Sequence, residues 1–184
     1  MIANFFNKSK PVVLFIIILS LFIYYTAASI IFEFNVFSTF LLLERLGVFC
    51  VFVVFILLVN FIIQKNNITQ NNSYALLLIV LLLGTFHETM FSNSLLFSNF
   101  VLLLAFRKVY SLRSGFNTKQ KLFDAGFWVG IASLIYVWSF LFIVLIYLAI
   151  LIYQKLDIKN FFIPVIGVAF PVFIYFTYCF YFDN

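Results

Sequence analysis

The stretch VVLFIIILSLFIYY, Val12–Tyr25, decides the fold class of this 184-residue chain. A membrane-spanning β-strand alternates polar and apolar side chains over about ten residues, and this stretch shows no such alternation. The apolar run extends over 11–32, and a helix needs about 20 such residues to cross a bilayer. It is also longer than the apolar core of a secretory signal, about 7 to 15 residues. The run therefore predicts an uncleaved membrane-spanning helix.

The composition extends this prediction to the whole chain. Hydrophobic residues make up 66% and charged residues 9%, and the mean hydropathy is +1.19. A soluble domain carries about a quarter charged residues. We therefore predict an all-α fold, a polytopic transmembrane helical bundle that forms one transmembrane domain over 1–184. The net charge of +5 does not point to nucleic acid, because the basic residues flank apolar runs. Membrane lipid is the expected partner.

Apolar segments bounded by polar connections indicate about seven spans. The candidate spans are 11–32, 46–63, 74–91, 95–112, 121–134, 136–153 and 160–181. Six spans are the alternative, if 121–153 forms one tilted helix. Such a helix of about 30 residues would run about 45 Å, beyond the roughly 30 Å hydrocarbon core. Against a hairpin, Ser133–Phe140 contains no glycine or proline to turn the chain.

The basic residues orient the predicted spans, because lysine and arginine concentrate in short cytoplasmic loops. With seven spans and a cytoplasmic N-terminus, all of the 11 basic residues except Arg45 face the cytoplasm. Of the 6 acidic residues, Glu33, Glu44, Glu88 and Asp183 fall on the opposite side. We expect a multi-pass protein of a bacterial inner membrane.

Two segments concentrate polar groups on the predicted outer side. HETMFSNS, His87–Ser94, interrupts an apolar run and holds the single histidine. A carboxylate at the bilayer centre costs roughly 3 kcal/mol, so we predict an outer turn there, with a site buried in the bilayer as the alternative. Polar residues at near-helical spacing over 35–45 predict a short interfacial helix.

Together these groups form a candidate outward-facing site. Glu33 and Glu44 are the candidate catalytic residues, because a carboxylate can act as a general base or bind a divalent cation. Arg45, His87 and Glu88 are the candidate substrate-binding residues, because arginine binds phosphate bidentately. Alternatively, these charges only mark where helices leave the bilayer.

Other chemistry has little support in the sequence. One histidine with Cys50 and Cys179 cannot form a His/Cys zinc site. The chain has no Walker A loop and no GxGxxG motif, so a divalent cation is the one cofactor that we consider.

Glycines and prolines in two predicted spans carry packing information. Gly126 and Gly130 form a GxxxG pattern, which allows close helix packing. Pro164, Gly167 and Pro171 predict an ordinary kink in the last span. A helix broken at a substrate site, as in transporters, is the alternative.

The opening MIANFFNKSKPVVLF and the stretch KLFDAGFWVGIASLIYVWSFLFIVLIYLAILIYQK, Lys121–Lys155, resemble a flavobacterial-type membrane protein family of unknown function. Members of that family are longer, so the chain would match their N-terminal part. The layout is similar to the N-terminal half of C-type glycosyltransferases (GT-C), which transfer sugars from polyprenyl phosphates. That resemblance implies an acidic catalytic residue and an amphipathic helix in the first outer loop, where Glu33 and Glu44 lie. Here the loop is short and has no adjacent paired acids.

Three functions follow as hypotheses. The first is a glycosyltransferase-like enzyme that acts on a lipid-linked substrate at the outer leaflet. The second is a non-catalytic membrane subunit whose phenylalanine-rich faces pack on partner helices. The third is a transporter, which the nearly uncharged interiors of most spans disfavour.

Overall fold

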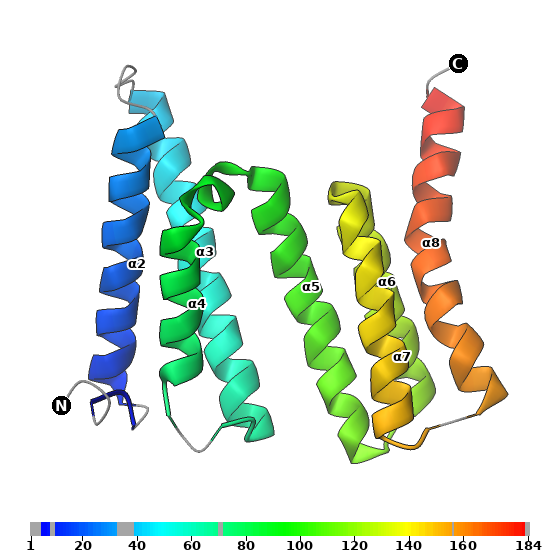
Figure 1. Cartoon of the computed structure of the whole chain (residues 1–184). Helices are drawn as coiled ribbons and strands as arrows, with labels where there is room; N and C mark the ends of the chain where they lie inside the picture. Colours follow the sequence, from blue (N-terminus) through cyan, green and yellow to red (C-terminus); the bar gives the residue numbers. More distant parts are fainter. Residues whose placement is uncertain (1–4, 8–9, 33–38, 70–71, 156, 183–184) are drawn as a thin grey trace. The chain divides into compact units, whose positions relative to one another are not determined.

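A computed structural model describes residues 5–7, 10–32, 39–69, 72–155 and 157–182. Most of these residues are helical, with no strand among them (Figure 1). The α-helices are α2 (Pro11–Phe32), α3 (Thr39–Asn66), α4 (Tyr74–Thr85), α5 (Asn93–Ser111), α6 (Thr118–Ile135), α7 (Ile143–Ile152) and α8 (Ile158–Phe182). Short 3-10 helices are η1 (His87–Phe91), η2 (Leu112–Ser114) and η3 (Val137–Phe142). The predicted all-α class is confirmed.

Four segments of the described chain are long and apolar enough to cross a membrane. They are Pro11–Ile31, Leu43–Asn66, Asn93–Ser114 and Ile158–Phe182. The 12 residues of α4 reach only about 18 Å as a helix, short of a roughly 30 Å core. The chain thus has the character of a membrane protein, whereas the count of seven spans and the cytoplasmic N-terminus stay predictions.

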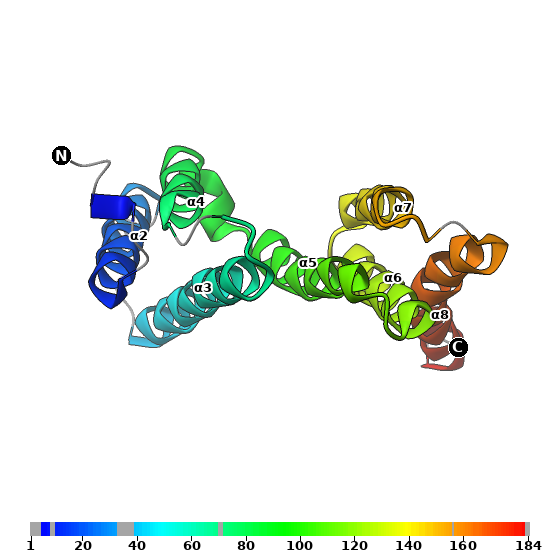
Figure 2. The same ribbon diagram turned by 90° about the horizontal axis from the view of Figure 1, so that it is seen from below.

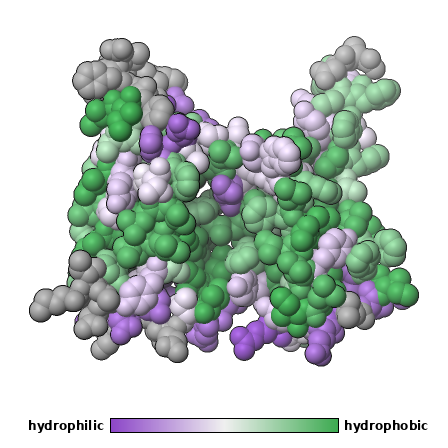
Figure 3. All heavy atoms as spheres, in the orientation of Figure 1, coloured by the Kyte–Doolittle hydropathy of each residue, from purple (hydrophilic) through white to green (hydrophobic). Residues whose placement is uncertain are grey.

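The chain divides into two compact units, Met1–Leu96 and Phe97–Asn184, with the boundary in the first turn of α5. In each unit, hydrophobic residues cover the middle of the helices and hydrophilic residues gather near their ends (Figure 3). This is the distribution that a bilayer imposes, because charged side chains avoid the hydrocarbon.

Unit 1 is a three-helix cluster in which α2 contacts both α3 and α4 (Figures 1 and 2). The buried stripe of α2 recurs about every fourth residue, at the spacing that keeps side chains on one helix face. Its members are Val13, Ile17, Leu21, Tyr25 and Ala28. A similar stripe on α3 comprises Val48, Phe52, Ile56, Val59 and Ile62. Large side chains therefore fill the space between these helices.

The predicted interfacial helix over 35–45 differs from the structure where it is described. Thr39 already belongs to α3, which continues without a break to Asn66. Residues 35–38 lie outside the described residues. The first turns of a long helix replace a separate helix, because nothing in TFLLLERLG stops helix propagation before Gly47.

Unit 2 is built around α6, which packs against α8, α7 and the turn η3. Its core combines small and branched residues from α5, α6, α7 and α8. Residues 121–153 do not form one continuous helix, so the alternative of a single tilted helix is wrong. Tyr136 is extended, with φ −143° and ψ 109°, a conformation that any residue can adopt. The turn therefore needs neither glycine nor proline.

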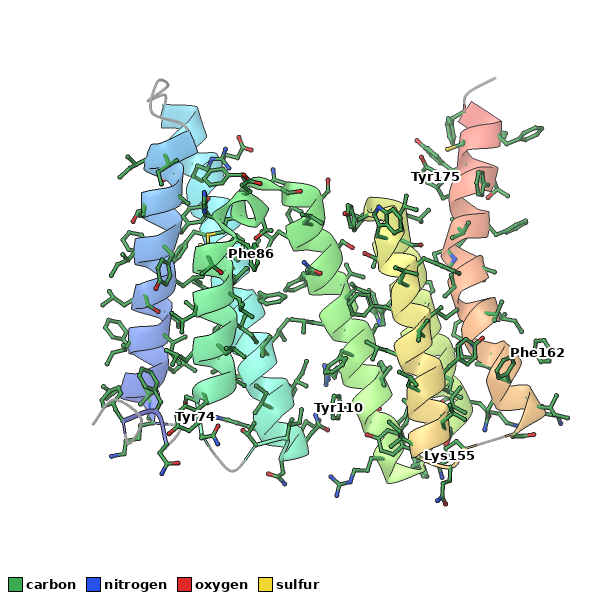
Figure 4. The ribbon with its side chains drawn as sticks, viewed as in Figure 1. Tyr74, Phe86, Tyr110, Lys155, Phe162 and Tyr175 are labelled. Atoms are coloured by element: carbon green, nitrogen blue, oxygen red, sulfur yellow. The ribbon has the colours of Figure 1, made fainter. Side chains whose placement is uncertain are left out.

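The hairpin of α6 and α7 brings basic residues back to one end of unit 2. A Cβ atom added at Gly115, just before α6, would lie 3.3 Å from the Lys155 ammonium, which follows α7. The Lys121 ammonium donates to the carbonyl of Ser111 at 2.7 Å. Within this unit, Lys155 thus lies beside the basic connection 107–121, as the hairpin predicts (Figure 4).

The glycines of α6 bring its backbone directly against α8. A Cβ atom at Gly130 would lie 2.7 Å from the Val168 carbonyl oxygen, and one at Gly167 would lie 2.5 Å from the Phe123 carbonyl oxygen. The predicted close packing of the GxxxG motif is confirmed. α8 also runs unbroken through Pro164 and Pro171, so the broken-helix alternative is wrong.

Candidate functional site

Three elements of unit 1 converge around the side chain of Arg45. Its guanidinium carbon lies 4.9 Å from the ring centroid of Phe91, at the end of η1. The Tyr25 hydroxyl of α2 donates to the Arg45 carbonyl at 3.1 Å. The Tyr25 and Phe91 rings are nearly parallel, with centroids 6.4 Å apart. We call this group of three residues the arginine cluster.

The local sequence explains how each element reaches this cluster. Tyr25 continues the buried stripe of α2, so its ring faces the other helices while its hydroxyl extends toward the helix end. Arg45 lies in the second turn of α3. Phe91 is positioned by its neighbour Met90, which is fully buried and anchors η1 in the unit. Apolar anchors thus hold a cation at this end of unit 1.

The Arg45 guanidinium can make two kinds of contact, one through its face and one through its edge. A cation over an aromatic face gains about 0.5 to 1 kcal/mol at an exposed site and more when desolvated. Stacking employs the guanidinium face, whereas hydrogen bonds to a phosphate employ the N–H groups along its edge. The two kinds of contact are therefore compatible in one side chain.

The cluster lies at the opposite end of unit 1 from the unit's described lysines, Lys10 and Lys65. The N–H of Ser73, before α4, donates to the carbonyl of Phe6 at 3.0 Å, which places the start of α4 against the segment before α2. Lys65 lies in the last turn of α3, at this same end. Within unit 1, the basic end and the arginine cluster are thus separated by the length of the helices (Figure 1).

One predicted site residue lies against the element that carries two others. Arg45 contacts η1, the 3-10 helix that contains His87 and Glu88. Glu44 and Glu88 are exposed and His87 is half-buried. Glu33, the other candidate catalytic residue, lies outside the described residues.

HETMFSNS forms a connection between two helices. Its first five residues are η1, after which Ser92 adopts an extended conformation and α5 begins at Asn93. His87 and Glu88 therefore lie outside the described helices that are long and apolar enough to cross a membrane. The turn interpretation of this segment agrees with the structure.

The described residues include no group of three or more His, Cys, Asp or Glu side chains that could hold a metal ion. Cys50 is exposed and Cys179 is half-buried, and both are free thiols. The charged side chains that the structure describes at this end of unit 1 are Arg45, Glu44 and Glu88.

Tyr25 and Phe91 were missed as site residues by the sequence reasoning. Tyrosine is enriched where membrane helices reach the interface, so the closing pair of VVLFIIILSLFIYY could have drawn attention to Tyr25. Phe91 carries no comparable signal, because the chain has 29 phenylalanines. Its role depends on a contact between residues that are 46 positions apart in the sequence, Arg45 and Phe91.

The comparisons with known proteins add no family to this picture. The sequence matches no protein-family model, and no curated protein and no solved structure shows significant similarity to it.

Proposed function

We propose that this chain is a multi-pass inner-membrane protein that binds a polyprenyl-phosphate-type lipid at the arginine cluster. Arg45 holds the phosphate, and the exposed carboxylate of the adjacent Glu44 takes the proton from an acceptor hydroxyl. The hydroxyl oxygen bonds to the anomeric carbon of the lipid-linked sugar, and the polyprenyl phosphate leaves with the electron pair of the broken C–O bond. The observation that carries the proposal is an arginine held over an aromatic ring at the end of a cluster of apolar helices. The same end holds acidic side chains.

The surroundings of Arg45 support a lipid rather than a soluble phosphate. The helices that carry Tyr25 and Arg45 include segments apolar and long enough to cross a membrane. A polyprenyl chain can lie along such helices while its phosphate stays at their polar end. The similarity of layout to C-type glycosyltransferases agrees with this substrate class.

Lipid binding provides the first test, because it does not require the activity to be known. Purified protein is titrated with a polyprenyl monophosphate in nanodiscs, and bound lipid is quantified by native mass spectrometry. Arg45→Gln should weaken binding about tenfold, as expected for one charge-assisted contact. The matched control is Lys65→Gln, because Lys65 also lies over an aromatic ring, Phe61 at 5.3 Å, but at the other end of α3. Equal losses in both variants would refute the assignment of Arg45.

Catalysis is tested separately with the carboxylates. Glu44→Gln should abolish turnover of a lipid-linked sugar yet leave binding of the polyprenyl phosphate unchanged. Glu33→Gln is measured in parallel, since Glu33 belongs to the same loop in the sequence. If both variants leave surface glycans and lipid-linked intermediates of the host cell unchanged, the chain is not this enzyme.

A non-catalytic membrane subunit is the second candidate function, and the C-terminal half of α8 favours it. The large side chains there are exposed, including Phe173, Phe176, Phe180 and Tyr181. Figure 4 shows Tyr175 on this part of α8. Recovery of a stoichiometric partner in mild detergent, lost on changing Phe176 and Phe180 to alanine, would favour this function over the enzyme.

A further inference from the structure

Two adjoining hollows lie where α6 and α8 begin in unit 2. One is an open hollow of about 480 Å³, and the residues that line it are all polar or charged: Asn117, Thr118, Lys119, Gln120, Asp157 and Asn160. The other is an open, mainly apolar hollow of about 350 Å³, lined by Asp157, Ile158, Phe161 and Phe162. Asp157 borders both. An amphiphilic ligand can therefore place its polar and apolar parts side by side here.

The polar hollow combines one cation with one anion. Lys119 and Asp157 are both exposed, and within the described residues neither side chain makes a hydrogen bond or an ion pair. Lys119 also belongs to the first turn of α6, where backbone N–H groups lack intrahelical acceptors and favour negative charge. This side of the hollow suits a phosphate, and the Asp157 side suits an ammonium group.

Asn160 gives the hollow a buried polar wall. It is 8% exposed, and its amide nitrogen donates to the Lys155 carbonyl at 2.9 Å. Its amide oxygen has no hydrogen-bond partner in the described structure. A buried acceptor of this kind favours a ligand that brings a hydrogen-bond donor.

The apolar hollow follows the first turns of α8. Ile158 is 80% exposed and Phe162 is 58% exposed, and Figure 4 shows Phe162 on the lower part of this helix. α8 is also one of the segments long and apolar enough to cross a membrane. An acyl chain that lies over these residues would continue along α8 into the bilayer, which a soluble phosphate compound cannot do.

We propose that these two hollows bind a phospholipid whose headgroup carries both a phosphate and a primary amine. Lys119 and the first turn of α6 hold the phosphate, and Asp157 and Asn160 accept from the ammonium group. Ile158, Phe161 and Phe162 contact the acyl chain. The site is separate from the arginine cluster and does not depend on the function proposed for it.

Native mass spectrometry of the detergent-purified full chain tests the lipid preference. The chain is titrated with phosphatidylethanolamine, phosphatidylcholine and phosphatidylglycerol that carry identical acyl chains. Phosphatidylethanolamine should bind about fivefold more tightly than phosphatidylglycerol, whose headgroup lacks the ammonium charge. It should also bind more tightly than phosphatidylcholine, whose quaternary ammonium carries the same charge but cannot donate a hydrogen bond. Equal binding of the three lipids overturns the proposal, and so does equal binding of soluble phosphoethanolamine and the lipid.

Single substitutions test whether the preference for phosphatidylethanolamine arises at the residues that line the two hollows. Lys119→Gln should weaken phosphatidylethanolamine binding about fivefold, whereas Arg113→Gln, an equal loss of charge outside the lining, should not. Asp157→Asn, which can still cap a helix, should remove the preference over phosphatidylglycerol, because the variant lacks the negative charge that attracts the ammonium group. Phe162→Ala should weaken lipid binding more than Phe173→Ala, its control on the same helix. Equal effects of Lys119→Gln and Arg113→Gln would mean general electrostatic attraction and would overturn the site.

Discussion

The two units of this chain hold their helices together in different ways. In unit 1, stripes of large side chains such as Ile17 and Ile56 separate the helix backbones. In unit 2, glycines let the backbones of α6 and α8 touch, so that a Cβ atom at Gly126 would collide with the carbonyl group of Pro164. The first arrangement depends on side-chain shape, the second on the absence of side chains.

The difference matters for a protein in a lipid environment. Lipid tails are as apolar as leucine, so helices there associate through close van der Waals packing and hydrogen bonds. A glycine contact maximises this packing but leaves no room for an additional atom. We therefore expect unit 2 to be more sensitive to small changes than unit 1.

The largest expected effect concerns the side of the membrane from which particular residues of each unit can be labelled. Single cysteines replace Glu88 in unit 1 and Trp138 and Lys155 in unit 2, in a chain with both native cysteines changed to serine. We expect Glu88→Cys and Trp138→Cys to react with a membrane-impermeant maleimide on intact cells, and Lys155→Cys to react only after lysis, because basic segments remain cytoplasmic. Labelling of Lys155→Cys on intact cells would contradict the predicted topology.

Glycine-to-alanine substitutions compare how much stability each unit loses when one methyl group is added to its packing. Gly126→Ala should destabilise the protein by about 2 kcal/mol, because the new methyl group meets a backbone that cannot move aside. Gly84→Ala in unit 1 should cost about 1 kcal/mol, since its methyl group would meet the Tyr24 ring at 2.9 Å. Gly47→Ala is the control, with no atom within 4 Å. Unfolding in mild detergent measures all three, and equal stability of the Gly126 and Gly47 variants would refute backbone contact.

A buried hydroxyl pair in unit 2 has the smallest expected effect. The Ser98 hydroxyl lies 2.5 Å from that of Ser139 and donates to the Ala132 carbonyl, so it joins α5 to the turn between α6 and α7. Ser98→Ala should cost about 0.6 kcal/mol, a typical value for such bonds between membrane helices. Ser133→Ala is the matched control, because its hydroxyl bonds only within its own helix, to Gly130. A loss no larger than that of the control would contradict a role for Ser98 in holding the turn.

The sequence predicted the helices best where one long apolar run stands between polar segments. The predicted span 11–32 coincides with α2, and 160–181 lies within α8. Prediction was poorer at the start of α3, because the amphipathic pattern over 35–45 does not reveal whether the helix is separate from its successor. The span 74–91 was also too long, since α4 ends at Thr85 and a 3-10 turn follows.

The candidate site was predictable only in its charged members. Arg45, His87 and Glu88 are noticeable because charged side chains are rare in an apolar chain. Tyr25 and Phe91 are two among many aromatic residues, and their importance arises from the ring and cation contacts that they make with Arg45 and with each other. A contact between two residues far apart in the chain cannot be predicted from the local sequence around each of them.

Hydropathy and periodicity by themselves determined that this protein is helical and largely apolar, because the hydrophobic effect acts on each segment independently of its neighbours. The tertiary structure decided where the chain turns and which helix faces meet. Its decisions include the turn at Tyr136, the contact of Gly126 with Pro164 and the placement of Arg45 over Phe91. Each of these depends on the packing of particular atoms from distant segments, and such packing exists only after the helices have come together.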